Sequence, residues 1–348
     1  MSSEIPSQSP YYSIVVTSRN DSHGGNIMKR MRLFVNGLIH QANAFKLQVE
    51  LVFVEWNPIE GAASLSEVLP KPKAEDHLRI RYIVVPNRIH AQYKRAEEIP
   101  LFQMIAKNVG IRRAKGEFII ASNVDLLFSD ALFEIMAAKA LDKQSFYRAN
   151  RVDFPDEISE DMPFADQLAY AEDNVIRRNG WDARFKYVNV RQHGIKELGP
   201  VSRWITDQMG KRHRKKQPAG EAAYYLLDRD ACGDFTMMHR DAWNAIKGYA
   251  ELDLYSIHVD TLGIVAANAL GYNQVVFPAE ACTYHIDHPS GWSSMGPVEK
   301  LKFLEQRPGI DFGVLQEVTY HLLENNAHLG VNTDDWGFAS EKFEEHIV

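Results

Sequence analysis

The feature that most constrains this chain is a repeated alternation of strand-like and helix-like segments over its first 140 residues or so. Short runs rich in β-branched and apolar residues have the length and composition of buried strands. These runs occupy residues 11–18, 47–56, 78–86 and 117–125. A chain that returns to such a strand after each helix favours a mostly parallel sheet over an antiparallel one.

The segments between these runs have helical character. From Ile27 to Ile39, apolar residues recur at a spacing that places them on one helix face. A second helix is predicted over 100–116, with Gly116 as the residue beyond its end. A third is predicted over 129–141, with Ser129 or Asp130 as N-cap. The sequence therefore predicts an α/β fold with a twisted, mostly parallel sheet flanked by helices.

Polar residues follow each predicted strand directly. They lie at 17–21, 55–57, 86–88 and 123–125. In open α/β sheets, ligands bind at the carboxyl ends of the strands, where such loops meet. We therefore expect these four segments to converge on one crevice.

After about residue 150 the alternation is lost and then resumes. We divide the chain into 11–150, the first half of an α/β domain; 151–230, an insertion with weak helical patterning; 231–295, the second half of the same domain; and 296–348, a helical tail. The segment 232–249 has a strand-then-helix pattern, and 259–277 has a helix-then-strand pattern that changes at Gly271. No internal repeat is present.

Composition narrows the class of protein. The 348-residue chain has a formal net charge of −7, which disfavours broad nucleic-acid binding. Its apolar runs are strand-sized, and the polar N-terminus lacks the apolar core of a signal peptide. Only two cysteines are present, Cys232 and Cys282, which suits a reducing compartment. These features predict a soluble, cytoplasmic protein without a transmembrane segment.

The end of the fourth predicted strand carries the most informative residues. Asn123 and Asp125 follow a buried apolar run directly. A carboxylate at this position can hold Mg²⁺ or Mn²⁺, which prefer oxygen ligands and share sites with phosphates. The alternative is that Asp125 only caps the following turn.

The residues around this position resemble the donor-binding core of family-2-type glycosyltransferases with the GT-A fold. That family has an N-x-G-hydrophobic-x-x-A-x-G-E-[FY]-I pattern before a D-x-D metal motif. The pattern is matched by Asn108, Gly110, Ala114, Gly116, Glu117, Phe118 and Ile119. The chain departs from it at Asn123, where the family has the first aspartate. The resemblance therefore implies that Asp125 binds the metal ion and that Asn108 and Asn123 lie at the nucleotide-sugar site.

Two further segments resemble the same family in the expected order. The end of the first strand matches through Thr17 and Asn20, with Arg19 between them. Glu55 takes the place of an acid that hydrogen-bonds the nucleotide base. Arg88, after the third strand, is a candidate to meet a diphosphate.

The second half adds candidates for the acceptor side and for catalysis. Asp260 matches the aspartate of the family's E-D motif, although Val259 replaces the glutamate. In inverting members that aspartate takes the proton from the acceptor hydroxyl. The alternative role is an N-cap of the apolar helix that follows. Asp234 and Trp292 are predicted to line the acceptor site.

Three potential ligands cluster near residue 285. His285, Asp287 and His288 follow a strand-like run, and the resemblance implies a late histidine that completes the metal site. A histidine here is otherwise structural. We predict His285 and His288 as metal ligands beside Asp125.

The basic run at 211–216 has two interpretations. It is either a solvated loop or a contact with anionic lipid headgroups or a polyprenyl-diphosphate acceptor.

Taken together, these residues predict a glycosyltransferase that uses Mn²⁺ or Mg²⁺ and moves a sugar from a nucleotide-diphosphate sugar to a hydroxyl acceptor. One alternative is a non-catalytic GT-A-like module that binds glycans or nucleotides, for which Asn123 and Val259 argue. The other is a sugar nucleotidyltransferase, which needs a glycine-rich basic loop that residues 17–25 do not resemble.

Overall fold

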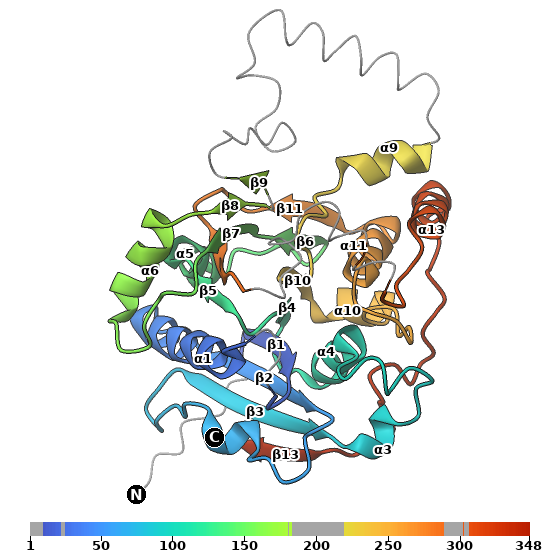
Figure 1. The fold of residues 1–348 in the computed structure, drawn as a ribbon. Helices are drawn as coiled ribbons and strands as arrows, with labels where there is room; N and C mark the ends of the chain where they lie inside the picture. The colour runs from blue at the N-terminus through green and yellow to red at the C-terminus, as the bar shows by residue number, and fades with distance from the viewer. Residues whose placement is uncertain (1–9, 22–24, 180, 183–218, 289–301, 303–305) are drawn as a thin grey trace, which may run out of the picture.

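The computed structural model describes residues 10–21, 25–179, 181–182, 219–288, 302 and 306–348. Within these residues an eight-stranded sheet has the order β11-β6-β10-β4-β1-β2-β3-β13, and a smaller sheet has the order β5-β12-β7-β8-β9. Helices cover both faces of the large sheet (Figure 1). The predicted α/β fold class, with its mostly parallel sheet between helices, is confirmed.

The centre of the large sheet consists of four parallel strands. They are β1 (Tyr12–Ser18), β2 (Val49–Trp56), β3 (Leu78–Val85) and β4 (Phe118–Ser122). Successive side chains of a strand point to opposite faces, so these strands supply two separate cores. Val15 belongs to one core, whereas Ile14 and Val16 belong to the other. Strands that are buried on both faces need continuous apolar runs, which the sequence supplies.

Each core is closed by its own helices. On one face lie α1 (Ile27–Ala44) and α5 (Asp130–Ala138), and on the other lie α4 (Gln103–Arg113), α10 (Arg240–Ile246) and α11 (Val259–Ala269) (Figure 1). Ser129 is the N-cap of α5, because its hydroxyl accepts a hydrogen bond from the Leu132 amide at 3.2 Å. Two single-turn helices follow β2 and β3, α2 (Leu65–Val68) and α3 (Asn87–His90).

One antiparallel strand brings the second half of the chain to the carboxyl ends of the central strands. β10 (Phe235–His239) pairs antiparallel with β4, and Phe235 lies opposite Ser122. The residues just before β10 therefore meet the residues just after β4. β6 (Ser145–Arg148) and β11 (Asn273–Val276) extend the sheet beyond β10.

The smaller sheet is joined to the large sheet by the turn that follows β4. Within it, β12 (Cys282–Ile286) lies between β5 (Leu126–Phe128) and β7 (Asn150–Phe154). The short strands β8 (Arg177–Arg178) and β9 (Trp181–Asp182) continue from β7, and α6 (Phe164–Asp173) follows β7 in the chain. The first residues of the predicted insertion, 151–154, are thus part of a sheet.

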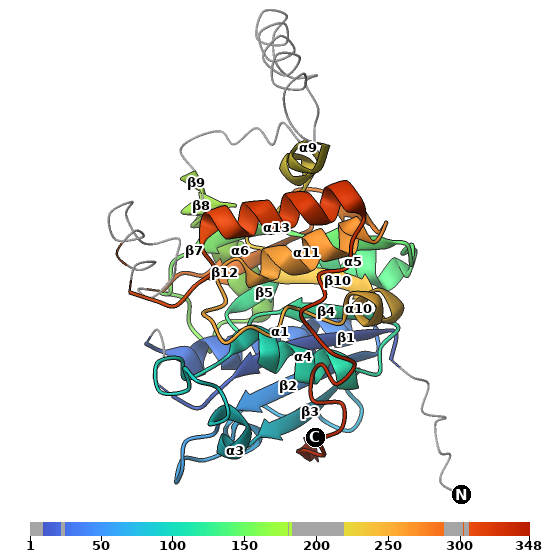
Figure 2. The same ribbon diagram turned by 90° about the vertical axis from the view of Figure 1, so that its right-hand side faces the viewer.

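The C-terminal part differs from the purely helical tail that was predicted. α13 (Phe312–Asn325) packs against α9 (Ala219–Leu226) and α11, as Figure 2 shows. The chain then runs past α4 and ends in β13 (Glu344–Ile347), which pairs antiparallel with β3. Trp336 is buried in this segment, and Arg113 donates hydrogen bonds to the carbonyls of Gly337, Phe338 and Glu341.

Gly116 has a role other than the predicted helix end. α4 ends at Arg113, and Gly116 instead lies against the backbone of β1. A β-carbon at this position would lie 2.4 Å from the Ser13 backbone nitrogen. Gly116 is therefore required by close approach of two backbone segments and does not cap α4.

We expect Gly116→Ala to lower the free energy of unfolding by about 1–3 kcal/mol, because the added methyl group forces the backbone of β1 to move. The measurement is urea denaturation followed by tryptophan fluorescence. Gly309→Ala is the control, since the nearest atom to a new β-carbon there is 3.9 Å away. Equal stability of the two variants would show that β1 and the 114–117 turn adjust without cost.

Candidate active site

Asp125 lies in the turn between β4 and β5, at the carboxyl end of the central strands. Its backbone carbonyl accepts a hydrogen bond from the Ile286 amide at 3.0 Å. The antiparallel pairing of β5 with β12, in which Leu126 lies opposite His285, holds the two segments together. This pairing brings His285 and His288 to Asp125 across 160 residues of sequence.

The three predicted metal ligands converge in the structure. Asp125 Oδ2 lies 3.5 Å from His285 Nε2 and 3.3 Å from His288 Nε2. One ligand atom from each residue lies within 4.8 Å of the other two. The Asp125 side chain is 14% exposed. Its Oδ1 is buried and has no hydrogen-bond partner among the described residues.

The charges around Asp125 keep it ionised. Burial by itself raises the pKa of this carboxyl, but the two neighbouring imidazoles outweigh burial and hold its pKa well below the ordinary value. An ionised carboxylate with one unpartnered oxygen is a competent ligand for a divalent cation.

A second layer of side chains orients His285. Asp153 on β7 is fully buried, and its Oδ1 lies 2.9 Å from His285 Nδ1. Arg177 and Arg151 both pair with the Asp153 carboxylate, and Arg151 Nη2 also lies 2.9 Å from His285 Nδ1. Burial and Arg151 lower the pKa of His285, yet Asp125 and Asp153 prevail and raise it to about 9. Without a metal ion the ring is therefore protonated at neutral pH, and its positive charge lies between the carboxylates of Asp125 and Asp153.

Asn123 lies two residues before Asp125, and both the oxygen and the nitrogen of its amide bond protein groups. Its Oδ1 accepts hydrogen bonds from Gln103 Nε2 and Lys107 Nζ, both at 2.8 Å. Its Nδ2 donates to Asp234 Oδ1 at 2.6 Å. The second Asp234 oxygen pairs with Arg151 Nη1 at 3.0 Å. Asp234 therefore links Asn123 to Arg151, which contacts His285.

Asp260 lies in the first turn of α11, beside the turn that carries Asp234. Its Oδ1 accepts a hydrogen bond from the Thr261 amide at 2.8 Å. Its Oδ2 lies against Gly233, where a β-carbon would be only 2.9 Å away. The N-cap of α11 is His258, so Asp260 is free of the N-cap role considered as its alternative.

The residues predicted at the ends of β1 and β2 lie side by side, but they contact protein atoms. The Thr17 hydroxyl donates to the Val54 carbonyl at 2.9 Å. Glu55 accepts from the Leu65 amide at 3.0 Å, and Asn20 donates to the Ala63 carbonyl at 2.7 Å. Burial raises the pKa of Glu55, and the Leu65 amide partly offsets this. Glu55 and Asn20 thus hold the loop that leads into α2 against the carboxyl ends of β1 and β2.

Arg19 lies next to this loop at the same end of β1. Its guanidinium donates to the Pro100 carbonyl at 3.4 Å and lies 3.6 Å from the Asp21 carboxylate.

Two predicted nucleotide-binding residues are not brought to the Asp125 cluster. Arg88 is 56% exposed and pairs with Glu341 of the C-terminal segment at 2.9 Å. Asn108 is fully buried, and its amide bonds Tyr249 and Glu251 instead. Both residues hold other parts of the chain to the fold. Trp292 and the basic run 211–216 lie outside the described residues.

The sequence prediction missed Lys107, Arg151 and Asp153. Each is a charged residue within a run that is otherwise buried, and each is itself largely buried. A charge inside an apolar segment is the signal that marks such residues, because burial of an unpaired charge is costly. Burial lowers the pKa of Lys107 to about 8, although Asp234, Asp260 and Asp125 act in the opposite direction.

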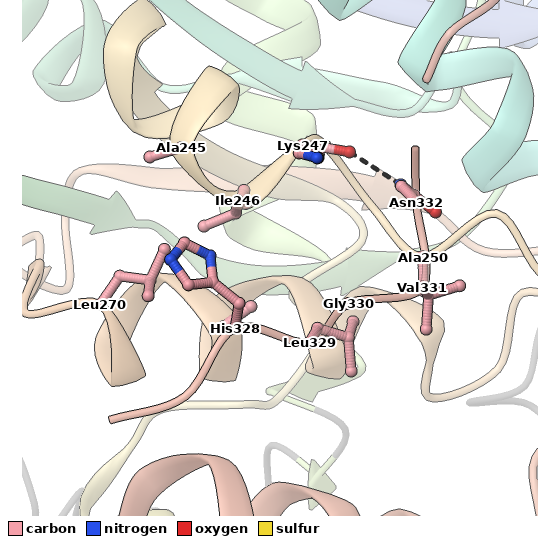
Figure 3. A pocket seen from close by; sticks show the side chains of 12 residues that line it. Ala245, Ile246, Lys247, Ala250, Leu270, His328, Leu329, Gly330, Val331 and Asn332 are labelled. Carbon is pink, nitrogen blue, oxygen red and sulfur yellow. Dashed lines mark hydrogen bonds between the residues drawn. The ribbon is translucent and has the colours of Figure 1, made fainter. Parts of the chain in front are cut away.

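A cavity of about 280 Å³ lies elsewhere in the molecule. It is bounded by the end of α10, by the last turn of α11 and by residues 328–332, as Figure 3 shows. Asn332 donates a hydrogen bond to the Lys247 carbonyl at its edge. Asp260 is at the other end of α11, about 15 Å along the helix axis. None of the residues that line this cavity belongs to the Asp125 cluster.

In the part of the chain that the structure describes, no helix is long and apolar enough to cross a membrane.

No family model matches the sequence, and no curated protein matches it. Among solved structures, S. aureus TarS 1-349 matches with a TM-score of 0.41 and 13% sequence identity, over 90% of this chain and 71% of that chain.

Proposed function

We propose that this protein is a GT-A-type glycosyltransferase that uses a divalent cation and a nucleotide-diphosphate sugar. The observation that carries the proposal is the Asp125 cluster at the carboxyl end of the central strands. There an ionised carboxylate, one oxygen of which is buried and has no hydrogen-bond partner among the described residues, faces two imidazoles. One carboxylate and two imidazoles suit Mn²⁺, and Mg²⁺ accepts the carboxylate with water.

The residues of the crevice have distinct roles in this proposal. Asp125, His285 and His288 would hold the cation, with Asp153 orienting His285. Bound Mn²⁺ or Mg²⁺ supplies positive charge that stabilises the diphosphate as it leaves. The ends of β1 and β2, with Thr17, Arg19, Asn20 and Glu55, would shape the nucleoside site.

Asp260 would take the proton of the acceptor hydroxyl as that oxygen attacks the anomeric carbon. This role applies if the reaction inverts configuration at that carbon, because a retaining reaction does not need the base there. Asp260 lies beside Gly233 on the side of the crevice formed by the second half of the chain. The acceptor is a hydroxyl of a glycan, a lipid-linked saccharide or a small molecule.

Calorimetry with UDP and GDP tests the proposal directly. We expect one of them to bind in the presence of Mn²⁺ and to bind at least tenfold more weakly after EDTA treatment. Binding of neither nucleotide under both conditions would remove the proposal.

One observation favours a second candidate function, a binding module without catalysis. The oxygen of Asn123 is fully engaged by Gln103 and Lys107, so this position offers no second acidic ligand. Glycan binding that needs neither nucleotide nor Mn²⁺ would support this candidate.

The pKa of His285 predicts how Mn²⁺ binding depends on pH. Its folded-state pKa of about 9 lies above the ordinary 6.5, so the protonated ring stabilises the metal-free fold below pH 6.5. That contribution is lost as the pH rises through about 9. A metal ligand must be neutral, so we expect Mn²⁺ affinity to rise about tenfold per pH unit between pH 7 and 9.

The measurement is Mn²⁺ titration followed by electron paramagnetic resonance from pH 6.5 to 8.5. His285→Gln is the comparison, and its weaker binding should lose this steep rise. A wild-type affinity that does not change with pH would exclude His285 as a ligand.

A further inference from the structure

The orientation of the Asn123 amide is fixed by its neighbours. Lys107 Nζ and Gln103 Nε2 are donors, so the oxygen of Asn123 must face them. The Asp234 carboxylate is an acceptor, so the nitrogen of Asn123 must face it. No rotation of the amide satisfies these three groups equally well.

Lys107 is one of the two donors to the Asn123 oxygen. It is fully buried, and its two hydrogen bonds to described residues go to neutral oxygens, Asn123 Oδ1 and the Gly233 carbonyl at 2.8 Å. A buried ammonium ion carries a large desolvation cost, which two neutral acceptors offset only in part. Through these two bonds, Lys107 holds Asn123, which is the hydrogen-bond partner of Asp234, and Gly233, which precedes Asp234 in the chain.

The contact between positions 123 and 234 allows only one carboxylate. Their side-chain atoms approach to 2.6 Å, a distance that suits an amide N–H and a carboxylate oxygen. An aspartate at 123 would place two carboxylates in direct contact, and they cannot both be ionised there without large cost. The departure from the D-x-D pattern is thus coupled to the presence of Asp234.

We infer that Asn123 and Asp234 form one hydrogen-bonded amide–carboxylate pair. In this pair Asp234 supplies the negative charge that the D-x-D pattern places at position 123. Lys107 is the positioning residue that orients the pair. The assignment of the pair to ligand binding rests on the proposed function. Asn123 then contributes no metal ligand. Asp234, held by Asn123 and Arg151 with its side chain 7% exposed, is then the anionic member of the pair.

A reciprocal exchange tests the pair. The variants are Asn123→Asp, Asp234→Asn and the double exchange, each examined by urea unfolding and by calorimetry with Mn²⁺ and UDP or GDP. We expect Asn123→Asp to weaken nucleotide binding at least tenfold and to lower the unfolding midpoint. The double exchange restores one donor opposite one acceptor, and should return nucleotide affinity to within about threefold of wild type.

A matched control comes from another asparagine–aspartate pair. Asn43 Nδ2 donates to Asp76 Oδ1 at 2.8 Å near the start of β2 and β3, away from the crevice. The exchange of Asn43 and Asp76 should show the same recovery in unfolding but leave nucleotide affinity unchanged. Lys107→Met should weaken nucleotide binding as strongly as Asn123→Asp.

Two outcomes would overturn the inference. One is a double exchange in which the fold-change in nucleotide affinity equals the product of the fold-changes of the two single variants. That result would mean that the residues do not act as a pair. The other is an Asn123→Asp variant with wild-type stability and affinity. If wild type binds neither nucleotide, the proposed function fails, whereas the unfolding data still decide whether the pair exists. If Lys107→Met does not fold, the exchange still provides the test.

Discussion

Asp125→Ala is expected to bind Mn²⁺ at least about 100-fold more weakly than wild type. The substitution removes the only carboxylate of the Asp125, His285 and His288 cluster and leaves two imidazoles facing each other. Release of UDP or GDP from a panel of nucleotide sugars should fall by a factor of about 10² to 10³, because the leaving diphosphate loses its stabilising charge. Electron paramagnetic resonance of free Mn²⁺ and a nucleotide-release assay measure the two effects.

Asp241→Ala is the control for this experiment. Asp241 is an acid in the first turn of α10, its side chain is 81% exposed, and it lies outside the cluster. It should leave Mn²⁺ binding unchanged. Wild-type Mn²⁺ affinity in Asp125→Ala would remove the metal assignment and, with it, the role of the two histidines.

Asp260→Asn is expected to reduce sugar transfer by a factor of about 10² to 10⁴, while UDP or GDP binding and the unfolding midpoint remain unchanged. The amide oxygen can still accept the hydrogen bond of the Thr261 amide, so the first turn of α11 keeps its structure. It cannot accept a proton at neutral pH, which removes the proposed base. Transfer is measured with the nucleotide sugar that the release assay identifies.

The separation between binding and transfer makes this result specific. Parallel loss of nucleotide affinity would place Asp260 in the binding site instead. Undiminished transfer would mean that the base lies elsewhere or that the reaction retains configuration. The stereochemistry of the product, read by nuclear magnetic resonance, distinguishes these two cases.

The elements of the large sheet were predictable because their signals are local. Buried parallel strands need continuous apolar runs, and a helix between two such strands needs an apolar face. Both patterns are visible in β1, α1, β2 and β4 before any long-range contact is known. Convergence of the strand ends then follows from parallel pairing, which is why the position of Asp125 was predictable.

β7 and β13 had no comparable signal. β7 mixes arginine and aspartate with apolar residues, and its Arg151 and Asp153 side chains form an ion pair in the folded protein. β13 is a short, mostly exposed edge strand whose pairing with β3 joins residues more than 250 positions apart. Local periodicity contains no information about such partners.

The sequence by itself determined the α/β class, the crevice end of the sheet and the three residues of the Asp125 cluster, since each depends on local pattern or on a motif. Only the tertiary structure decided which polar residues lie near the Asp125 cluster and which do not. It engaged Asn108 with Tyr249 and Glu251, paired Arg88 with Glu341, and brought Lys107, Arg151 and Asp153 beside Asp234 and His285. The physical reason is that the partner of a buried charge is set by chain segments that meet only after folding, and electrostatic pairing leaves no periodic trace in the sequence.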